Sequence, residues 1–165
     1  MDQLSQLKEK LSKERPASWE NLPDIELYKD QVVGYMQRQH TLEPEDAQLT
    51  GAMINNYIKS GLLPRASGKK YTKDHLAYLT AICALKQVLS VSETDLLMKA
   101  QPEGKDAERF YNEYTMLLDE SLKETVDLIN ESMNREDLAR MAFKLAVTSY
   151  VQKLLCKKLL DILKI

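Results

Sequence analysis

The sequence predicts a mainly α-helical protein, in which a compact helical domain is followed by a long antiparallel helical hairpin. Apolar residues recur at three- and four-residue steps along most of the chain, the spacing that places them on one face of a helix. The five prolines all fall between these stretches, where they end helices. With 165 residues, 44% of them hydrophobic and 29% charged, the chain can bury a core as one domain, or as one small domain with an appended element.

Residues 1–23 are predicted to form a short helix followed by an irregular arm. The helix would be amphipathic, and Pro16 would end it. Its apolar face is formed by Leu4, Leu7 and Leu11. The arm carries the only tryptophan of the chain, Trp19, and we expect Trp19 and Leu22 to be buried against the core.

The next segment is predicted to be a helix from Asp24 to Arg38. Asp24 is a suitable N-cap, because its carboxylate can accept hydrogen bonds from the otherwise unpaired amides of the first turn. Apolar and aromatic residues recur at helical steps at Ile25, Tyr28, Val32, Tyr35 and Met36. A long, acidic connector from His40 to Gln48 leads to the following helix.

The segment from Thr50 to Lys59 is predicted to be a short helix with two different faces. Thr50 can cap its start, whereas Gly61 and Pro64 end it. The core-facing residues would be Met53, Ile54, Tyr57 and Ile58. The exposed polar residues would be Thr50, Asn55, Asn56 and Lys59.

These exposed polar residues point to nucleic acid as a partner. An asparagine amide can donate and accept together at the edge of adenine. Two observations favour other interpretations of this helix. One of Asn55 and Asn56 could be a capping or packing amide, and Gly51 lacks the long side chain that a direct reader of bases needs.

A basic loop follows between Pro64 and Tyr71. Its cations, Arg65, Lys69 and Lys70, are suited to phosphate contacts, which position a protein on DNA without reading its sequence. From residue 56 to residue 90 six basic residues occur with one acidic residue, although the net charge of the whole chain is −2. A basic patch on an acidic protein is expected of a polyanion binder, and a solvated surface is the alternative.

Two further residues beside the loop are candidate DNA contacts. Tyr71 has two open interpretations, a hydrogen bond to a phosphate or a place over the core. Lys73 could meet a phosphate together with the positive end of a helix that Thr72 caps. We expect this helix to run to Ser90 and its His75 to pack rather than to catalyse.

The last third of the chain is predicted to be a helical hairpin. Ser92 with Asp95 resembles a capping box for a short helix that ends at Ala100, and the boundary follows at 101–104. Two helices of nearly 30 residues would then cover 105–133 and 135–165, with Asn134 and Asp137 capping the second. Because two helices make a thin core, the remaining apolar face must pack on the first domain or on a second copy of the chain.

Several of these segments resemble MerR-type winged helix-turn-helix regulators. Asn56 to Pro64 (NYIKSGLLP) is similar to their Tyr-x-x-x-Gly-Leu-Leu-x-Pro segment, and Lys70 to Leu76 (KYTKDHL) to the segment after their wing. Leu85 to Glu93 is similar to the stretch before their next short helix. With Trp19 and Leu27 to Val32 upstream, the pattern is closer still to a bacterial family catalogued only as a domain of unknown function, over residues 17–100.

Together with the helical pattern, the resemblance predicts three parts: an N-terminal helix and irregular arm (1–23), a MerR-like winged helix-turn-helix domain with a small wing loop or hairpin (24–100), and a C-terminal helical hairpin for dimerisation or effector binding (105–165). It implies a transcriptional regulator that binds double-stranded DNA as a homodimer. The alternative is a non-enzymatic helical interaction module that keeps the winged fold without binding DNA.

Other functional classes have little support in the sequence. No G-x-S-x-G, H-E-x-x-H or phosphate-cradling glycine loop is present, so we expect no enzymatic activity and no cofactor. Cys83 and Cys156 have no Cys or His at metal-ligand spacing, so we expect two reduced core thiols and no metal site. The charged N-terminus does not resemble a signal peptide, and a cytoplasmic location is expected.

Overall fold

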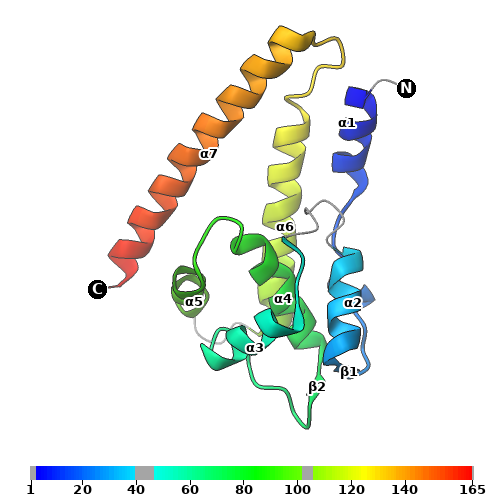
Figure 1. Cartoon of the computed structure of the whole chain (residues 1–165), viewed down its shortest axis with the longest axis vertical. Helices are drawn as coiled ribbons and strands as arrows, with labels where there is room; N and C mark the ends of the chain where they lie inside the picture. Colours follow the sequence, from blue (N-terminus) through cyan, green and yellow to red (C-terminus); the bar gives the residue numbers. More distant parts are fainter. Residues whose placement is uncertain (1–2, 40–46, 102–105, 165) are drawn as a thin grey trace. The chain divides into compact units, whose positions relative to one another are not determined.

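The computed structural model describes residues 3–39, 47–101 and 106–164, which form seven α-helices, one 3-10 helix and one two-stranded sheet (Figure 1). The mainly helical fold is therefore confirmed. The elements are, in order, α1 (Gln3–Lys13), η1 (Trp19–Asn21), β1 (Leu27–Tyr28), α2 (Lys29–Gln39), α3 (Gly51–Lys59), β2 (Lys70–Tyr71), α4 (Lys73–Leu85), α5 (Val91–Lys99), α6 (Ala107–Val126) and α7 (Arg135–Leu163).

The chain divides into two compact units. The central unit is Glu14–Asp119, and the terminal unit combines Met1–Lys13 with Glu120–Ile165. The division falls inside α6, later than the predicted boundary at 101–104, of which residues 102–104 lie outside the described residues. The central unit thus contains the predicted winged domain, the arm and the first part of α6.

The core of the central unit gathers around α2, α3 and α4. The buried residues of this core include Val32, Met36, Leu49, Ile54, Tyr57, Leu63, Leu76, Leu79, Ile82 and Cys83. Met53 and Ile58 are partly buried and pack against it, so the predicted apolar face of the helix at 50–59 is confirmed. A second cluster joins Leu22 to Tyr111 on α6, where Trp19 is half-buried with its ring centroid 6.2 Å from that of Tyr111.

The predicted helix start at Asp24 is wrong. Residues 27–28 form β1, which pairs antiparallel with β2, so that Leu27 lies opposite Tyr71 and Tyr28 opposite Lys70. The helix begins only at Lys29, where the Gln31 side chain accepts a hydrogen bond from the Tyr28 amide at 2.9 Å. Local periodicity missed β1 because its partner lies more than forty residues later in the chain.

The predicted helix from 72 to 90 is also too long, since α4 ends at Leu85. The cap of α5 is Ser90 rather than Ser92. Ser90 Oγ accepts from the Glu93 amide at 3.2 Å, and the Glu93 carboxylate accepts from the Ser90 amide at 2.8 Å. This reciprocal capping box starts a helix two residues earlier than the predicted pair of Ser92 and Asp95.

In the terminal unit, α6 ends at Val126 instead of continuing to Met133. Asn130 Oδ1 accepts from both the amide and the hydroxyl of Ser132, which stabilises a turn after the helix. Asn134 then caps α7 as predicted, with Asp137 as its capping-box partner. The antiparallel pairing of these two helices stays a prediction.

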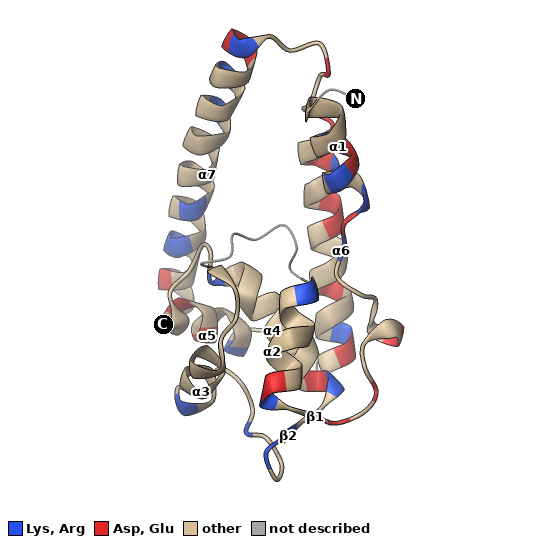
Figure 2. Cartoon of the chain, turned by 45° about the vertical axis from the view of Figure 1, so that its right-hand side comes forward, with Lys and Arg blue, Asp and Glu red and all other residues tan. Residues whose placement is uncertain are grey.

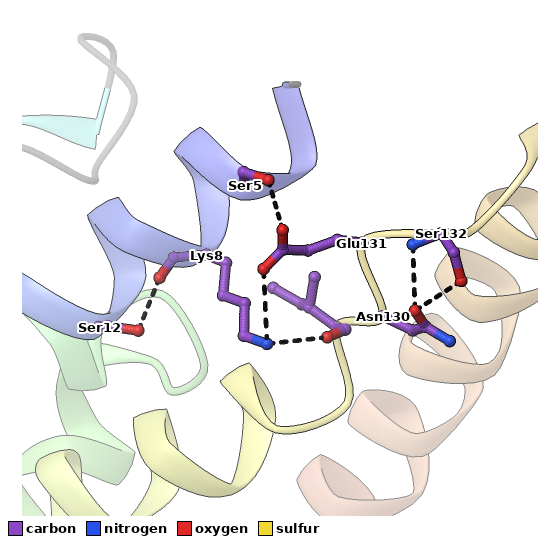
Figure 3. Close-up of polar contacts among 7 residues, drawn as sticks. Ser5, Lys8, Ser12, Asn130, Glu131 and Ser132 are labelled. Atoms are coloured by element: carbon purple, nitrogen blue, oxygen red, sulfur yellow. Dashed lines mark hydrogen bonds and ion pairs between the residues drawn. The ribbon is translucent and has the colours of Figure 1, made fainter. Parts of the chain in front are cut away.

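Helix α1 is bound to the turn between α6 and α7 (Figure 3). Ser5 Oγ donates to the Glu131 carboxylate at 2.6 Å, and Lys8 Nζ donates to the Ile129 carbonyl at 3.3 Å. The same ammonium lies 3.9 Å from Glu131. These polar contacts join α1 to the turn after α6, within one compact unit. Within the described residues, no helix has both the length and the apolar character that crossing a bilayer requires.

Candidate nucleic-acid interface

One pocket of the central unit lies where the basic loop, the end of α3 and the start of α2 meet. It has a volume of about 740 Å³ and is lined by Tyr28, Lys29, Asp30, Ile58, Arg65, Ala66, Lys69 and Tyr71. Three of these residues are basic and one is acidic, so the pocket favours a negatively charged ligand. Figure 2 shows the basic residues on the loop that leads into β2. We call this site the basic pocket.

Helix α3 forms one edge of the interface, with its polar face exposed as predicted. Asn55, Asn56 and Lys59 are all exposed. The hydroxyl of Thr50 accepts from the Met53 amide at 3.3 Å and so acts as the N-cap. Thr50 therefore holds the start of the helix, and the exposed amides and Lys59 remain the side chains available to a ligand.

Gly61 determines how the chain turns from the end of α3 into the basic loop. Gly61 has a φ of 81°, a left-handed conformation that only glycine adopts without strain, and it reverses the chain after the helix. Leu62 and Leu63 are then buried, and the Leu63 amide donates to the Tyr57 carbonyl at 3.0 Å. The loop is thus attached to the core at its first residues.

The tip of the loop is a tight turn at residues 67–70. The Lys70 amide donates to the Ser67 carbonyl at 3.0 Å, and the two central residues, Gly68 and Lys69, both have positive φ, at 57° and 65°. Positive φ at both positions is the pattern of a type I′ hairpin turn, which favours glycine and asparagine. Lys69 therefore occupies an uncommon conformation for lysine, which projects the residue at the tip of the predicted wing.

Lys70 and Tyr71 form β2 and behave differently from the loop tip. The Lys70 ammonium lies 3.8 Å from the Glu26 carboxylate and 5.9 Å from the centroid of the Tyr28 ring. Tyr71 is buried, and its ring packs edge-on against His75 with centroids 5.3 Å apart. Burial raises the pKa of the Tyr71 hydroxyl above its usual value. Of the two interpretations of Tyr71, the structure favours the place in the core.

His75 links the basic loop to α4. Its Nδ1 accepts from the Thr72 amide at 3.0 Å, so the proton is on Nε2, which donates to the Pro64 carbonyl at 3.1 Å. This buried histidine therefore has a structural role. Lys73, in the first turn of the same helix, places its ammonium 4.8 Å from the centroid of the Trp19 ring. It does not line the basic pocket, whereas Arg65 and Lys69 do.

Five of the eight residues that line the pocket were not predicted as contacts, and Lys29 is the basic residue among them. Lys29 begins α2, and its ammonium donates to Asn55 Oδ1 on α3 at 2.6 Å. The predicted helix starting at Asp24 placed Lys29 inside a regular helix, with no reason to approach Asn55. Gly51 was the one available signal, because a glycine inside a short helix often marks a close approach of another group.

The central unit is also the part of the chain that is similar to known proteins. Residues 17–115 match the family described as Domain of unknown function (DUF1836). The chain belongs to the DUF1836 family. The matched region covers every residue of the basic pocket and nearly all of the central unit, whereas α1 and α7 lie outside it. No curated protein and no solved structure matches the chain.

A second feature of this DUF1836 protein is the apolar surface of α7, in the terminal unit. Large apolar side chains are exposed along almost its whole length, for example Phe143 at 73%, Tyr150 at 66% and Ile162 at 66%. One stripe at helical steps consists of Phe143, Val147, Tyr150 and Leu154. Another stripe consists of Leu138, Leu145, Leu155, Leu159 and Ile162.

Metal binding has no candidate in the described part of the DUF1836 protein. Among residues 3–39, 47–101 and 106–164, no group of three His, Cys, Asp or Glu side chains could hold an ion. Cys83 is a buried thiol of the core, and Cys156 is a half-buried thiol of α7. His40, the other histidine, lies outside the described residues.

Proposed function

We propose that this DUF1836 protein is a DNA-binding transcriptional regulator that acts as a homodimer. The observation that carries the proposal is the basic pocket, where Lys29, Arg65 and Lys69 surround one concavity beside the exposed amides of α3. Clustered cations on a chain of net charge −2 are the electrostatic footprint of a polyanion ligand. We further propose that it acts in the cytoplasm, without a cofactor and without enzymatic activity.

The proposed binding mode is that of a MerR-like winged helix-turn-helix. The order of elements supports it: α2 and α3 follow one another, and a tight basic turn and β2 come next. In such a mode α3 enters the major groove and presents Asn55, Asn56 and Lys59 to bases, while the turn contacts phosphates. The pairing of β2 with β1, which directly precedes α2, connects the turn at residues 67–70 to the start of α2.

The roles of the predicted contact residues divide accordingly. Arg65 and Lys69 are the phosphate contacts, because both are exposed at the pocket. Lys70 contributes less, because Glu26 already lies beside its ammonium. We assign Thr50, Tyr71 and Lys73 supporting positions: the cap of α3, the core beside His75, and the indole of Trp19.

The proposed dimer rests on the two apolar stripes of α7. At about 100° per residue their centres lie roughly 150° apart around the helix, so a single neighbouring helix cannot cover both. A helix that is apolar on opposite sides is normally buried, and contiguous exposed apolar surfaces often mark interfaces. Since α6 could cover at most one stripe, a second copy of α7 is the proposed occupant of the other.

The proposal is tested by fluorescence anisotropy of a labelled duplex over a series of salt concentrations. Replacing Arg65 and Lys69 by Gln should weaken binding to all sequences. It should also reduce the slope of log K against log salt by about 2, because each phosphate contact contributes close to one unit. The matched control, Lys10→Gln with Lys13→Gln on α1, removes the same charge and should leave the slope unchanged.

Equal slopes for the wild type and the Arg65 and Lys69 variant would contradict the role of the basic pocket. Absence of binding at low salt would favour a different function, a helical protein–protein interaction module that keeps the winged fold. Two observations favour that second function, the exposed stripes of α7 and the carboxylate of Glu26 beside Lys70.

A further inference from the structure

The start of α2 and the middle of α3 are joined by a single side chain. Lys29 is the first residue of α2, and its ammonium donates to Asn55 Oδ1 at 2.6 Å. The aliphatic part of the same side chain lies against Gly51. A Cβ added to Gly51 would lie 3.3 Å from Lys29 Cδ and 3.9 Å from Cγ. The Lys29 side chain therefore passes over the first turn of α3, and its ammonium binds Asn55.

The course of the Lys29 side chain explains why α3 has a glycine at position 51, where a helix that reads bases was expected to carry a longer side chain. Gly51 has a helical place in the first turn of α3, where a larger residue would have a better helix propensity. The structure gives the glycine a different purpose, since any side chain at this position would crowd the stem of Lys29. Gly51 is thus the position that lets Lys29 reach Asn55.

The contact determines which way the amide of Asn55 faces. An ammonium group only donates, so it must meet the carbonyl oxygen of the amide and not its nitrogen. Arg65 and Lys69 line the same pocket and repel the Lys29 ammonium, which favours the neutral acceptor on α3. Asp30 also lines the pocket, but within the described residues the polar contact of Lys29 is with Asn55.

An amide held in this way presents Nδ2 to a ligand as a donor. Its Oδ1 keeps a second lone pair, but the positive charge of the Lys29 ammonium beside it disfavours a further donor such as the adenine N6 amino group. Recognition of adenine by asparagine needs a donor and an acceptor together, for N7 and the N6 amino group. Guanine, with acceptors O6 and N7, and thymine, with acceptor O4, need only donors. The orientation of one amide therefore decides which base edges α3 can read at this position.

We infer that Lys29 is a positioning residue for base specificity: through Gly51 and Asn55 it makes α3 prefer guanine or thymine over adenine at the base that Asn55 contacts. The inference rests on the proposed DNA-binding function and deepens it. It makes Lys29 and Gly51 as important for sequence preference as the residue that touches the base.

The test is selection from a randomised duplex pool, followed by sequencing, with the full-length wild type and three variants. Asn55→Ala identifies the base position concerned, as the one whose preference is lost. Lys29→Met keeps the apolar stem and removes the donor, so adenine should gain about tenfold at that position, the lower end of the range for a bidentate pair. Gly51→Ala presses on the stem of Lys29, which must move by a few tenths of an ångström, and should shift the preference in the same direction by a smaller factor.

Lys59→Met is the matched control on α3, because it removes the same charge from an exposed position. It should weaken binding and leave the preference at the base position that Asn55 contacts as it is. A purely structural role of Lys29 would likewise lower affinity without changing a preference. Circular dichroism and thermal melting of each variant establish that the helices are intact.

The outcomes separate this inference from the proposed function. DNA binding with an unchanged preference in Lys29→Met and Gly51→Ala would overturn the inference and leave the function in place. Absence of wild-type binding at low salt would overturn both. A measurement without DNA adds an independent check: the side-chain amide resonances of Asn55 should shift in both variants, and Lys29→Met should shift them more than Lys59→Met does.

Discussion

The two units of this protein differ in how completely they bury their apolar residues. In the central unit, Val32, Met36, Ile54, Leu76 and Leu79 are fully buried. In the described part of the terminal unit only Val126 and Leu160 are buried. Yet α7 alone carries more large apolar residues than any of the core helices α2, α3 and α4 of the central unit. The central unit therefore buries its apolar residues within one chain, whereas the terminal unit leaves most of its apolar residues exposed, which is the basis of the proposed dimer.

The difference also separates two sources of helix stability. In the central unit α3 has nine residues and α5 has nine, lengths that are marginal without tertiary packing. The Thr50 cap and the buried Leu62 and Leu63 hold α3, and the Ser90 capping box holds the start of α5. By contrast, α7 has 29 residues and a complete capping box, but most of its large apolar side chains are exposed. Its stability should depend on association.

The largest effect is expected from substitutions that disrupt the proposed dimer interface of α7. Leu155→Glu with Leu159→Glu places two charges in one apolar stripe, where each would be buried unpaired on association at a cost of several kcal/mol. The dimer should dissociate, with a dissociation constant raised by about two orders of magnitude or more, while the central unit stays folded. Light scattering at micromolar concentration measures the mass.

Lys153→Glu is the control for this variant. It changes the net charge by the same amount and lies on α7 outside both stripes, so the dimer should persist. A wild-type mass of one chain at micromolar concentration would end the dimer hypothesis, and a dimeric Leu155 and Leu159 variant would move the interface elsewhere.

The next effect concerns the core of the central unit. Leu79→Ala removes a fully buried side chain and should lower the free energy of unfolding by about 2–5 kcal/mol, through lost burial and the cavity left behind. Chemical denaturation measures this loss, and Val88→Ala, at an exposed position, should change it by less than about 0.5 kcal/mol. If the dimer forms through α7 without the central unit, the Leu79→Ala protein should still have the mass of a dimer at denaturant concentrations too low to unfold it.

The smallest expected effect is a dependence of stability on alkaline pH. Burial raises the pKa of Tyr111 to about 12 and raises the pKa values of Tyr35, Tyr71 and Tyr78. From pH 10 to 12 the unfolded chain loses these protons and the folded central unit keeps them, so the stability of the central unit falls as pH rises. Tyr111→Phe removes the hydrogen bond to the Ala17 carbonyl and should flatten this dependence.

Thermal melting between pH 8 and pH 11 measures this decline. The Tyr111→Phe protein should start less stable by about 1 kcal/mol, the usual contribution of one hydrogen bond, and lose less as the pH rises. A melting temperature that rises over this pH range would contradict the predicted fall in stability.

The parts of the fold that the sequence predicted are those with local causes. The helix at Gly51–Lys59 follows from Thr50 as a cap and Gly61 as a stop, and the start of α7 follows from Asn134 with Asp137. Both signals lie within four residues of the structure that they determine. The basic loop and its charge were equally visible in the sequence.

The parts that the sequence did not predict depend on distant residues. Leu27 is a strand residue because Tyr71 lies opposite it, and Lys29 reaches Asn55 because Gly51 makes room. Because the position of Lys29 depends on that distant contact, the sequence named Arg65 and Lys69 as ligand contacts but not Lys29. The choice of Ser90 over Ser92 as a cap is an exception, since both candidate capping boxes are local.

The most direct test of the central claim is selection of bound DNA from a randomised duplex pool by the full chain, over a series of salt concentrations. The account predicts steep salt dependence and an enriched motif with two-fold symmetry, whose half-sites lie about one helical turn apart. Absence of binding at low salt would contradict the account, and the central unit would then have to act on protein partners.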